Sequence, residues 1–394
     1  MIDSETEINA APPPVNSGWL DRVCIVLSVL VLLVFTLFLF WTLPLTGPLL
    51  SFPAAGAVII LFAARPTKAQ LMWSMVIGIA YAGTYLQSHQ FISEAFVGAP
   101  VVNAFAFWGV GSILVLGWRA VVHSPYLDYF LLSLAGPSLM ILVRLALAVA
   151  LPFQPQPFDL NLYAVDSRLG LPLWRVAAEA LRSCRPLANA CAFVYTALWL
   201  AQVLSMLLFL KGKRRMAANP FFTIPVAGVL GCVLYQICPA SGPLYAFGND
   251  FPHVTTSTAR VVAGLAQAPR NAVPSLHAAW ALLIFWSTKG YGAGLRWAAA
   301  VFLTLTLVAT LGSGEHYLVD LIVGLVFAVF IQAVAERQWL WAALNAGVTL
   351  LCCVYLRLGW VSAINPWLLV ALCALSSVSF LTRDLEWKPG RTTG

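Results

Sequence analysis

Three ionisable side chains stand at the starts of two strongly apolar segments. His277 ends the string PSLH, and His316 and Asp320 belong to the string EHYLVD. Ionisable residues inside or at the rim of a membrane span cost free energy and are therefore functional candidates by default. The types and order of these residues predict a site for acid–base or nucleophilic chemistry.

The spacing of His316 and Asp320 suits a histidine oriented by a carboxylate. Residues four apart share one helix face, with their Cβ atoms about 5–6 Å apart. A carboxylate there can accept the imidazole N–H, which fixes the tautomer and makes the other nitrogen a better nucleophile or base. His277 can then protonate a departing alkoxide. Phosphoryl transfer needs these two functions and positive groups for the equatorial oxygens.

The elements that position these residues are predicted to be membrane helices. The chain is 61% hydrophobic and 9% charged, whereas a soluble domain has about 25% charged residues. Its apolar blocks have about the 17–25 residues that cross a bilayer. We expect an all-α polytopic integral membrane protein with about 12 transmembrane helices. The predicted spans are 20–44, 47–64 (in which Pro48 and Pro53 also allow a re-entrant or broken element), 69–88, 103–122, 126–151, 187–210, 218–238, 274–290, 294–313, 317–335, 338–357 and 362–382.

The basic residues predict the orientation of these spans. With the N-terminus inside, fourteen of the 22 Lys and Arg residues fall in inside loops, as the enrichment of short cytoplasmic loops predicts. Both termini are then cytoplasmic, and His277, His316 and Asp320 lie on the periplasmic or extracytoplasmic face, for which we expect a bacterial inner membrane. The net charge of +7 is scattered at span ends, so we predict no nucleic-acid partner.

The predicted organisation has five parts. They are a disordered tail at 1–18, an N-terminal membrane domain of about five spans at 19–151, an amphipathic outer-face segment at 152–186, a catalytic core at 187–335, and two further spans with a tail at 336–394. The amphipathic segment is interpreted as an interfacial helix. Cys184 and Cys238 lie near outer span ends and can pair. No cysteine spacing typical of a metal site occurs in the sequence, and we predict no metal or other cofactor.

The combination Pro-Ser-x-His followed by His-x-x-x-Asp resembles the type 2 phosphatidic acid phosphatase superfamily. The resemblance covers roughly residues 155–335. It implies a six-helix core and a phosphohistidine mechanism. His316 would be the nucleophile, Asp320 its orienting carboxylate and His277 the proton donor, and Ser275 with nearby backbone N–H groups would hold phosphate.

The sequence departs from the lipid phosphatases of this superfamily in its cations. Their Lys-x6-Arg-Pro motif is missing, and Thr310 stands where their second motif has arginine. The strings PASGP, VPSLHA and EHYLVD instead resemble the inositol phosphorylceramide synthase branch. Arg270 is the best candidate for a phosphate ligand and Arg260 the second; a solvated loop residue is an equal alternative for Arg270 and the favoured one for Arg260. Tyr235 can contact a headgroup and Glu315 an acceptor hydroxyl, whereas Asp159 and Asp166 are most simply helix caps or loop residues.

These observations predict a membrane lipid phosphotransferase or phosphatase, with transfer between lipids favoured by the branch resemblance. The substrates would be a phospholipid, a sphingolipid or a polyprenyl phosphate. A lipid-phosphate phosphatase is the first alternative, since hydrolysis only replaces the acceptor by water. A lipid transporter or scramblase is the second, because the N-terminal spans have no assigned role. The sequence makes no prediction of oligomeric state.

Overall fold

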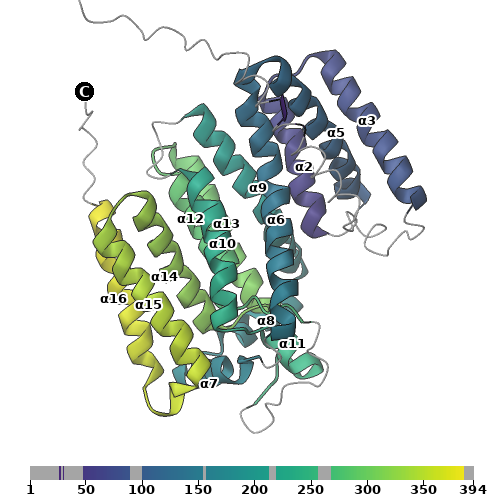
Figure 1. Ribbon diagram of the computed structural model, residues 1–394. Coiled ribbons are helices and arrows are strands. Elements are labelled where there is room, and N and C mark those ends of the chain that lie inside the picture. The colour runs from purple at the N-terminus through teal and green to yellow at the C-terminus, as the bar shows by residue number, and fades with distance from the viewer. Residues whose placement is uncertain are drawn as a thin grey trace, which may run out of the picture.

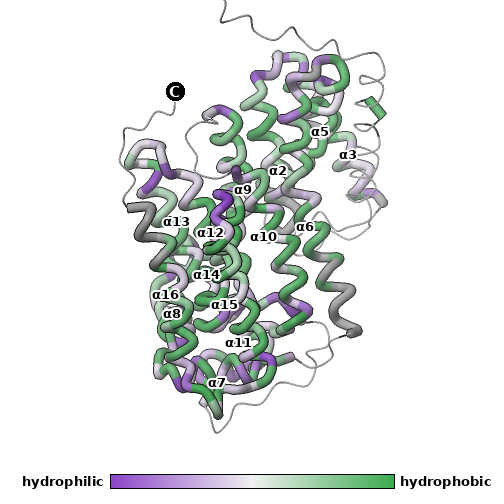
Figure 2. The backbone as a smooth tube through the Cα atoms, turned by 60° about the vertical axis from the view of Figure 1, so that its left-hand side comes forward, coloured by the Kyte–Doolittle hydropathy of each residue, from purple (hydrophilic) through white to green (hydrophobic). Residues whose placement is uncertain are grey.

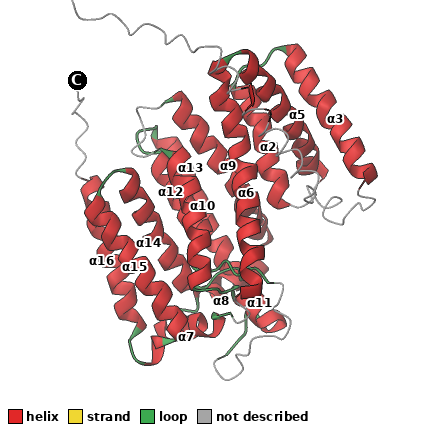
Figure 3. Cartoon of the chain, viewed as in Figure 1, coloured by secondary structure: helices red, strands yellow, loops and turns green. Residues whose placement is uncertain are grey.

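The computed structural model describes residues 26–27, 30, 48–88, 100–153, 157–212, 219–255 and 268–385. All regular elements in these ranges are helices (Figures 1 and 3). The predicted all-α fold is therefore confirmed for this part of the chain. The predicted span 20–44 lies almost wholly outside the described residues.

The described part of the N-terminal half contains four long helices. They are α2 (Pro48–Ala63), α3 (Lys68–Ser88), α5 (Pro100–Val122) and α6 (Leu127–Phe153). The helix α5 packs against α2, α3 and α6, and α3 lies at the outer edge of the group (Figure 1). Pro53 lies within α2, so this predicted segment is a continuous helix and not a broken element.

Glycines on α5 allow the closest helix contacts in this half. A Cβ atom on Gly109 would lie 1.9 Å from the carbonyl oxygen of Ala54 in α2, and one on Gly111 would lie 1.9 Å from that of Ser74 in α3. In lipid, helices associate through van der Waals packing between backbones, which small residues permit. The two glycines therefore fix α5 between α2 and α3.

The C-terminal half is a bundle built around α14. Its helices are α9 (Arg185–Lys211), α10 (Pro220–Ile237), α12 (Leu276–Ser287), α13 (Ala293–Gly312), α14 (Leu318–Ala335), α15 (Trp339–Leu358) and α16 (Pro366–Leu385). The helix α14 is largely buried and packs against α10, α12, α15 and α16. The resemblance implied a core of six helices, and the described part of the predicted core 187–335 supplies five of this bundle's helices. The helix α15 packs on α14 and α10 but belongs to the segment that follows the predicted core.

The predicted amphipathic segment forms two helices, α7 (Asp159–Leu169) and α8 (Leu173–Ser183). The chain breaks at Gly170, which has a φ of 68°, a conformation that glycine adopts without strain. The helix α7 packs under α14 and α16 with six buried residues, and α8 packs on α9 and α13. The segment therefore forms two helices: α7 is integrated into the bundle, whereas α8 buries only Trp174 and Ala178.

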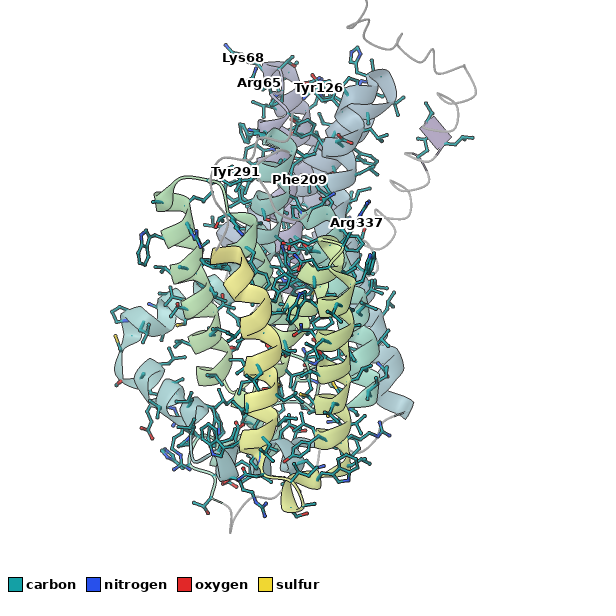
Figure 4. All side chains as sticks on the ribbon, turned by 90° about the vertical axis from the view of Figure 1, so that its left-hand side faces the viewer. Arg65, Lys68, Tyr126, Phe209, Tyr291 and Arg337 are labelled. Carbon is teal, nitrogen blue, oxygen red and sulfur yellow. The ribbon has the colours of Figure 1, made fainter. Side chains whose placement is uncertain are left out.

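One end of the bundle is more polar than its middle. The helices α7, α8 and α11 (Pro243–Phe247) gather there (Figure 1), and hydrophilic residues concentrate around α7 (Figure 2). Arg65, Lys68 and Arg337, which are predicted to be cytoplasmic, lie toward the opposite end (Figure 4). Cys184 and Cys238 are free thiols.

Among the described residues, six helices are long and apolar enough to cross a membrane, and four shorter apolar helices accompany them. The six are Asn103–Val122, Arg185–Lys211, Pro220–Ile237, Ala293–Gly312, Leu318–Ala335 and Trp339–Leu358. These helices indicate an integral membrane protein. A helix occupies each of the eleven predicted spans from 47–64 onward, but a total of about 12 crossings is not confirmed.

The contact between α5 and α2 can be tested with Gly109→Ala. The added methyl group would meet the Ala54 carbonyl, so we expect a loss of about 1–3 kcal/mol in stability, typical of overpacking. Thermal unfolding in detergent would measure it. Gly83→Ala on α3 is the matched control, because a Cβ atom there meets nothing within 4 Å. Equal unfolding midpoints for the two variants would contradict the close contact.

Candidate active site

The imidazole of His316 is held in one tautomer just before α14 begins. Its Nδ1 lies 3.1 Å from the carbonyl oxygen of Ala272 and 3.2 Å from Oδ2 of Asp320. Because a carbonyl oxygen can only accept, Nδ1 carries the hydrogen and Nε2 keeps its lone pair. His316 is 2% exposed and Asp320 is fully buried. The geometry therefore leaves Nε2 able to act as a nucleophile or a base.

His277 lies beside His316, in the first turn of α12. The two ring centroids are 5.8 Å apart, with an angle of 66° between the ring planes. The other face of His277 stacks on Tyr195 of α9, at a centroid distance of 4.2 Å and an angle of 15°. No hydrogen bond from a described residue reaches the His277 ring nitrogens. These nitrogens are therefore available to a substrate.

The two histidines are brought together by a close approach of α12 and α14. The backbone N–H of Ser275 donates to the carbonyl of Asp320 over 3.1 Å. A Cβ atom on Gly324 would lie 2.5 Å from the carbonyl oxygen of Ser275, so only glycine fits there. Ser275 also caps α12, because its hydroxyl accepts from the N–H of Ala278 at 3.3 Å. Its hydroxyl oxygen is thus already engaged in positioning His277.

Two buried aspartates of α7 anchor the backbone around the site. Asp166 accepts from the N–H groups of Leu318 at 2.8 Å and Val319 at 3.0 Å, which are the first two of α14. A carboxylate at that position is favoured by the unsatisfied N–H groups and the helix dipole. Asp166 therefore caps α14 from another helix and holds the segment that carries His316 and Asp320.

Asp159 anchors a second loop. Its carboxylate accepts from the N–H groups of Ser241 and Gly242 at 2.9–3.1 Å and from the hydroxyl of Tyr317 at 3.2 Å. Burial raises the pKa of Asp159 to about 6, although these hydrogen bonds and Arg270 oppose the rise. The string PASGP is therefore fixed to the residue that follows His316.

Arg270 is a buried cation of the site. It is 1% exposed, and its Nη1 donates to the hydroxyl oxygen of Ser241 over 2.7 Å. Its Nε is buried and has no hydrogen-bond partner in the described part of the chain. Burial lowers the pKa of this guanidinium, and the carboxylate of Asp159 opposes the change. Because a buried unpaired donor is costly, the Nε–H is well suited to an anionic ligand.

The other predicted site residues have different surroundings. Glu315 accepts a hydrogen bond from Tyr245 of α11, over 3.1 Å between Oη and Oε1. Tyr235 is 2% exposed on α10 and contacts the backbone of Leu276. Arg260 falls outside the residues that the structure describes. No group of three or more His, Cys, Asp or Glu side chains in the described ranges is arranged to hold a metal ion.

Three further residues of the site were not selected as site residues from the sequence. Ser241 belongs to PASGP, so that string carried a signal for it. Tyr195 and Tyr245 had no such signal in the sequence, because each looks like an ordinary aromatic residue in or near an apolar segment.

Comparison with known proteins agrees with this geometry. Residues 160–334 match the family model of the PAP2 superfamily, and this match supports placing that part of the chain in the superfamily. A match to this superfamily suggests phosphatase or phosphotransferase activity on lipid-like phosphates. No curated protein and no solved structure gives a significant match to the chain.

The environment of Asp159 predicts a pH dependence of stability. Its pKa of about 6 in the folded protein exceeds the value of about 3.9 for an unfolded chain. The folded state then binds the proton more tightly than the unfolded chain does, and this difference stabilises the fold. The stabilisation is complete below about pH 4 and is lost as the pH rises through about 6. We expect the thermal unfolding midpoint of wild type, minus that of Asp159→Asn, to decrease as the pH is raised from 4 to 7.

Asp250→Asn is the control for this comparison, because Asp250 is an exposed aspartate directly after α11. Its midpoint should follow that of wild type across the pH range. A pH-independent difference between wild type and Asp159→Asn would contradict the assignment.

Proposed function

We propose that this protein is a membrane enzyme that transfers a phosphoryl or phospho-headgroup through a covalent phosphohistidine on His316. The observation that carries the proposal is the Nδ1 hydrogen of His316, shared by the Ala272 carbonyl and Asp320. A histidine fixed in this way presents an unprotonated Nε2. The match to the PAP2 superfamily supports the same reaction class.

In the first half-reaction, Nε2 of His316 attacks phosphorus, and the bond from phosphorus to the leaving oxygen breaks. A protonated His277, whose ring lies 5.8 Å away, gives its proton to that oxygen. The phosphorylated imidazole keeps its Nδ1–H and becomes positively charged. Asp320 stabilises this charge because it already accepts the Nδ1–H.

Arg270 is the proposed phosphate ligand. Its Nη1 is held by Ser241, and its buried Nε is unpaired among the described residues. A guanidinium donor in a buried site stabilises the equatorial oxygens more strongly than a solvated one does. Backbone N–H groups near the start of α12 would supplement it. Ser275 caps this helix through its hydroxyl oxygen, and its hydroxyl hydrogen can still be donated to a phosphate oxygen.

Transfer between lipids is favoured over hydrolysis by the motifs PASGP, VPSLHA and EHYLVD, which resemble those of inositol phosphorylceramide synthases. Hydrolysis of a lipid phosphate is the alternative, with water in place of the acceptor. The basic residues predict that the site faces the extracytoplasmic side. Transport is less well supported, because a transporter's polar site is expected near mid-bilayer, and here these groups sit at helix starts.

His316→Ala tests the nucleophile. The purified protein would be given phosphatidate, a polyprenyl phosphate and an inositol phospholipid, and release of phosphate or headgroup would be followed. We expect a loss of about 10³-fold or more, as for removal of a catalytic nucleophile. His253→Ala, which alters an exposed histidine in the same outer region, should retain full activity. Equal turnover by His316→Ala and wild type would overturn the proposal.

Arg270→Lys tests the phosphate ligand. Lysine keeps the charge but lacks the Nε–H and the planar fork. We expect kcat/KM to fall about 10²-fold, as for loss of one oxyanion donor. Arg185→Lys is the control, since Arg185 is exposed at the start of α9 on the predicted outer side. If both variants had wild-type kcat/KM, Arg270 would not bind the transferred phosphate.

A further inference from the structure

A second polar cluster, formed by Tyr195, Tyr245 and Glu315, lies beside the two histidines. Tyr245 donates to Glu315 over 3.1 Å, and Tyr195 stacks on His277 at 4.2 Å. Tyr195 is also close enough to Glu315 and Tyr245 to interact electrostatically with both. The three side chains come from α9, α11 and the loop before α14, so the fold brings distant segments together here.

Glu315 is poorly suited to a site that binds only phosphate. It directly precedes His316, and no cation among the described residues lies within ion-pair distance of it. Burial raises its pKa, which reflects the cost of the charge. A carboxylate at this point repels an anion but accepts hydrogen bonds from hydroxyl groups. Its chemistry therefore complements a neutral hydroxylated molecule.

Tyr195 adds a donor to the same region. Its hydroxyl makes no hydrogen bond within the described part of the chain. A phenol can both donate and accept, and a tyrosine that is largely enclosed usually finds a partner. A carboxylate held by Tyr245 and a phenol without a partner together offer two points of attachment for adjacent hydroxyl groups.

We propose that Tyr195, Tyr245 and Glu315 bind the acceptor of the reaction at an uncharged part that carries adjacent hydroxyl groups. This inference rests on the proposed function. In the second half-reaction, one acceptor hydroxyl oxygen bonds to phosphorus as the bond from phosphorus to Nε2 breaks. The hydroxyl proton passes to His277, which gave its proton away in the first half-reaction. Glu315 accepts a hydrogen bond from the neighbouring hydroxyl and takes no proton.

The ratio of two products formed from one phosphoenzyme tests this assignment. Wild type, Glu315→Gln and Tyr195→Phe would each be given the lipid donor that wild type cleaves fastest, with glycerol or 1-propanol present. Transfer to the alcohol and transfer to water would be quantified together. This ratio does not depend on how fast the phosphoenzyme forms, so a general loss of activity does not affect it.

We expect both variants to lower the glycerol-to-water ratio about tenfold, which corresponds to one hydrogen bond of about 1.4 kcal/mol. The 1-propanol ratio should stay unchanged, because this alcohol has a single hydroxyl. Glu179→Gln, which removes an exposed carboxylate on α8, should match wild type with both alcohols.

The outcomes separate the two proposals. Suppose that wild type cleaves its donor and that Glu315→Gln and Tyr195→Phe have the same glycerol-to-water ratio as wild type. This result would overturn the acceptor site and leave the proposed function intact. An equal loss of the glycerol and 1-propanol ratios would also overturn it, because no second hydroxyl is then recognised. If wild type cleaved no donor faster than His316→Ala, the proposed function would fail, and the acceptor site with it.

Discussion

The hydrogen on Nδ1 of His316 is the interaction on which the rest of the site depends. It points at two acceptors from different elements, the Ala272 carbonyl before α12 and the Asp320 carboxylate on α14. It can satisfy both only if these elements stay in contact. The bond from Ser275 to the Asp320 carbonyl and the absence of a side chain at Gly324 maintain that contact. The electronic state of one imidazole is thus linked to the packing of two helices.

The same dependence explains why α7 is buried beneath the bundle. The first N–H groups of α14 need acceptors, and the loop at Ser241 and Gly242 needs a fixed position relative to Tyr317. Asp166 meets the first need and Asp159 the second. Both carboxyl groups are buried, and backbone N–H groups are their main partners, while Arg270 adds a favourable electrostatic interaction with Asp159. This arrangement fixes both backbone segments without an ion pair to either carboxyl group in the described part of the chain.

Local patterns in the sequence were sufficient for part of this architecture. Apolar blocks predicted the helices from 47–64 onward. The four-residue spacing predicted a contact between His316 and Asp320, which lie 3.2 Å apart, although His316 precedes α14 and does not share a helix face with Asp320. Long-range contacts were not predictable: that Asp166 caps α14 is visible only once residues 152 positions apart are brought together. The contact between Tyr195 and His277 was not predictable for the same reason, since it depends on how α9 packs against α12. The split of the amphipathic segment at Gly170 reflects the burial of α7, which periodicity alone does not report.

The charge balance of the site follows from how each buried group is satisfied. Acidic side chains outnumber cations among the described residues of the site, which include the buried guanidinium of Arg270 and the carboxyl groups of Asp159, Asp166, Glu315 and Asp320. The carboxylates of Asp159 and Asp166 are bound by backbone N–H groups, and that of Asp320 by the histidine. Arg270 donates to the neutral hydroxyl of Ser241 rather than to a carboxylate. Its charge is therefore not neutralised by an ion pair with any described residue and stays available to an anion.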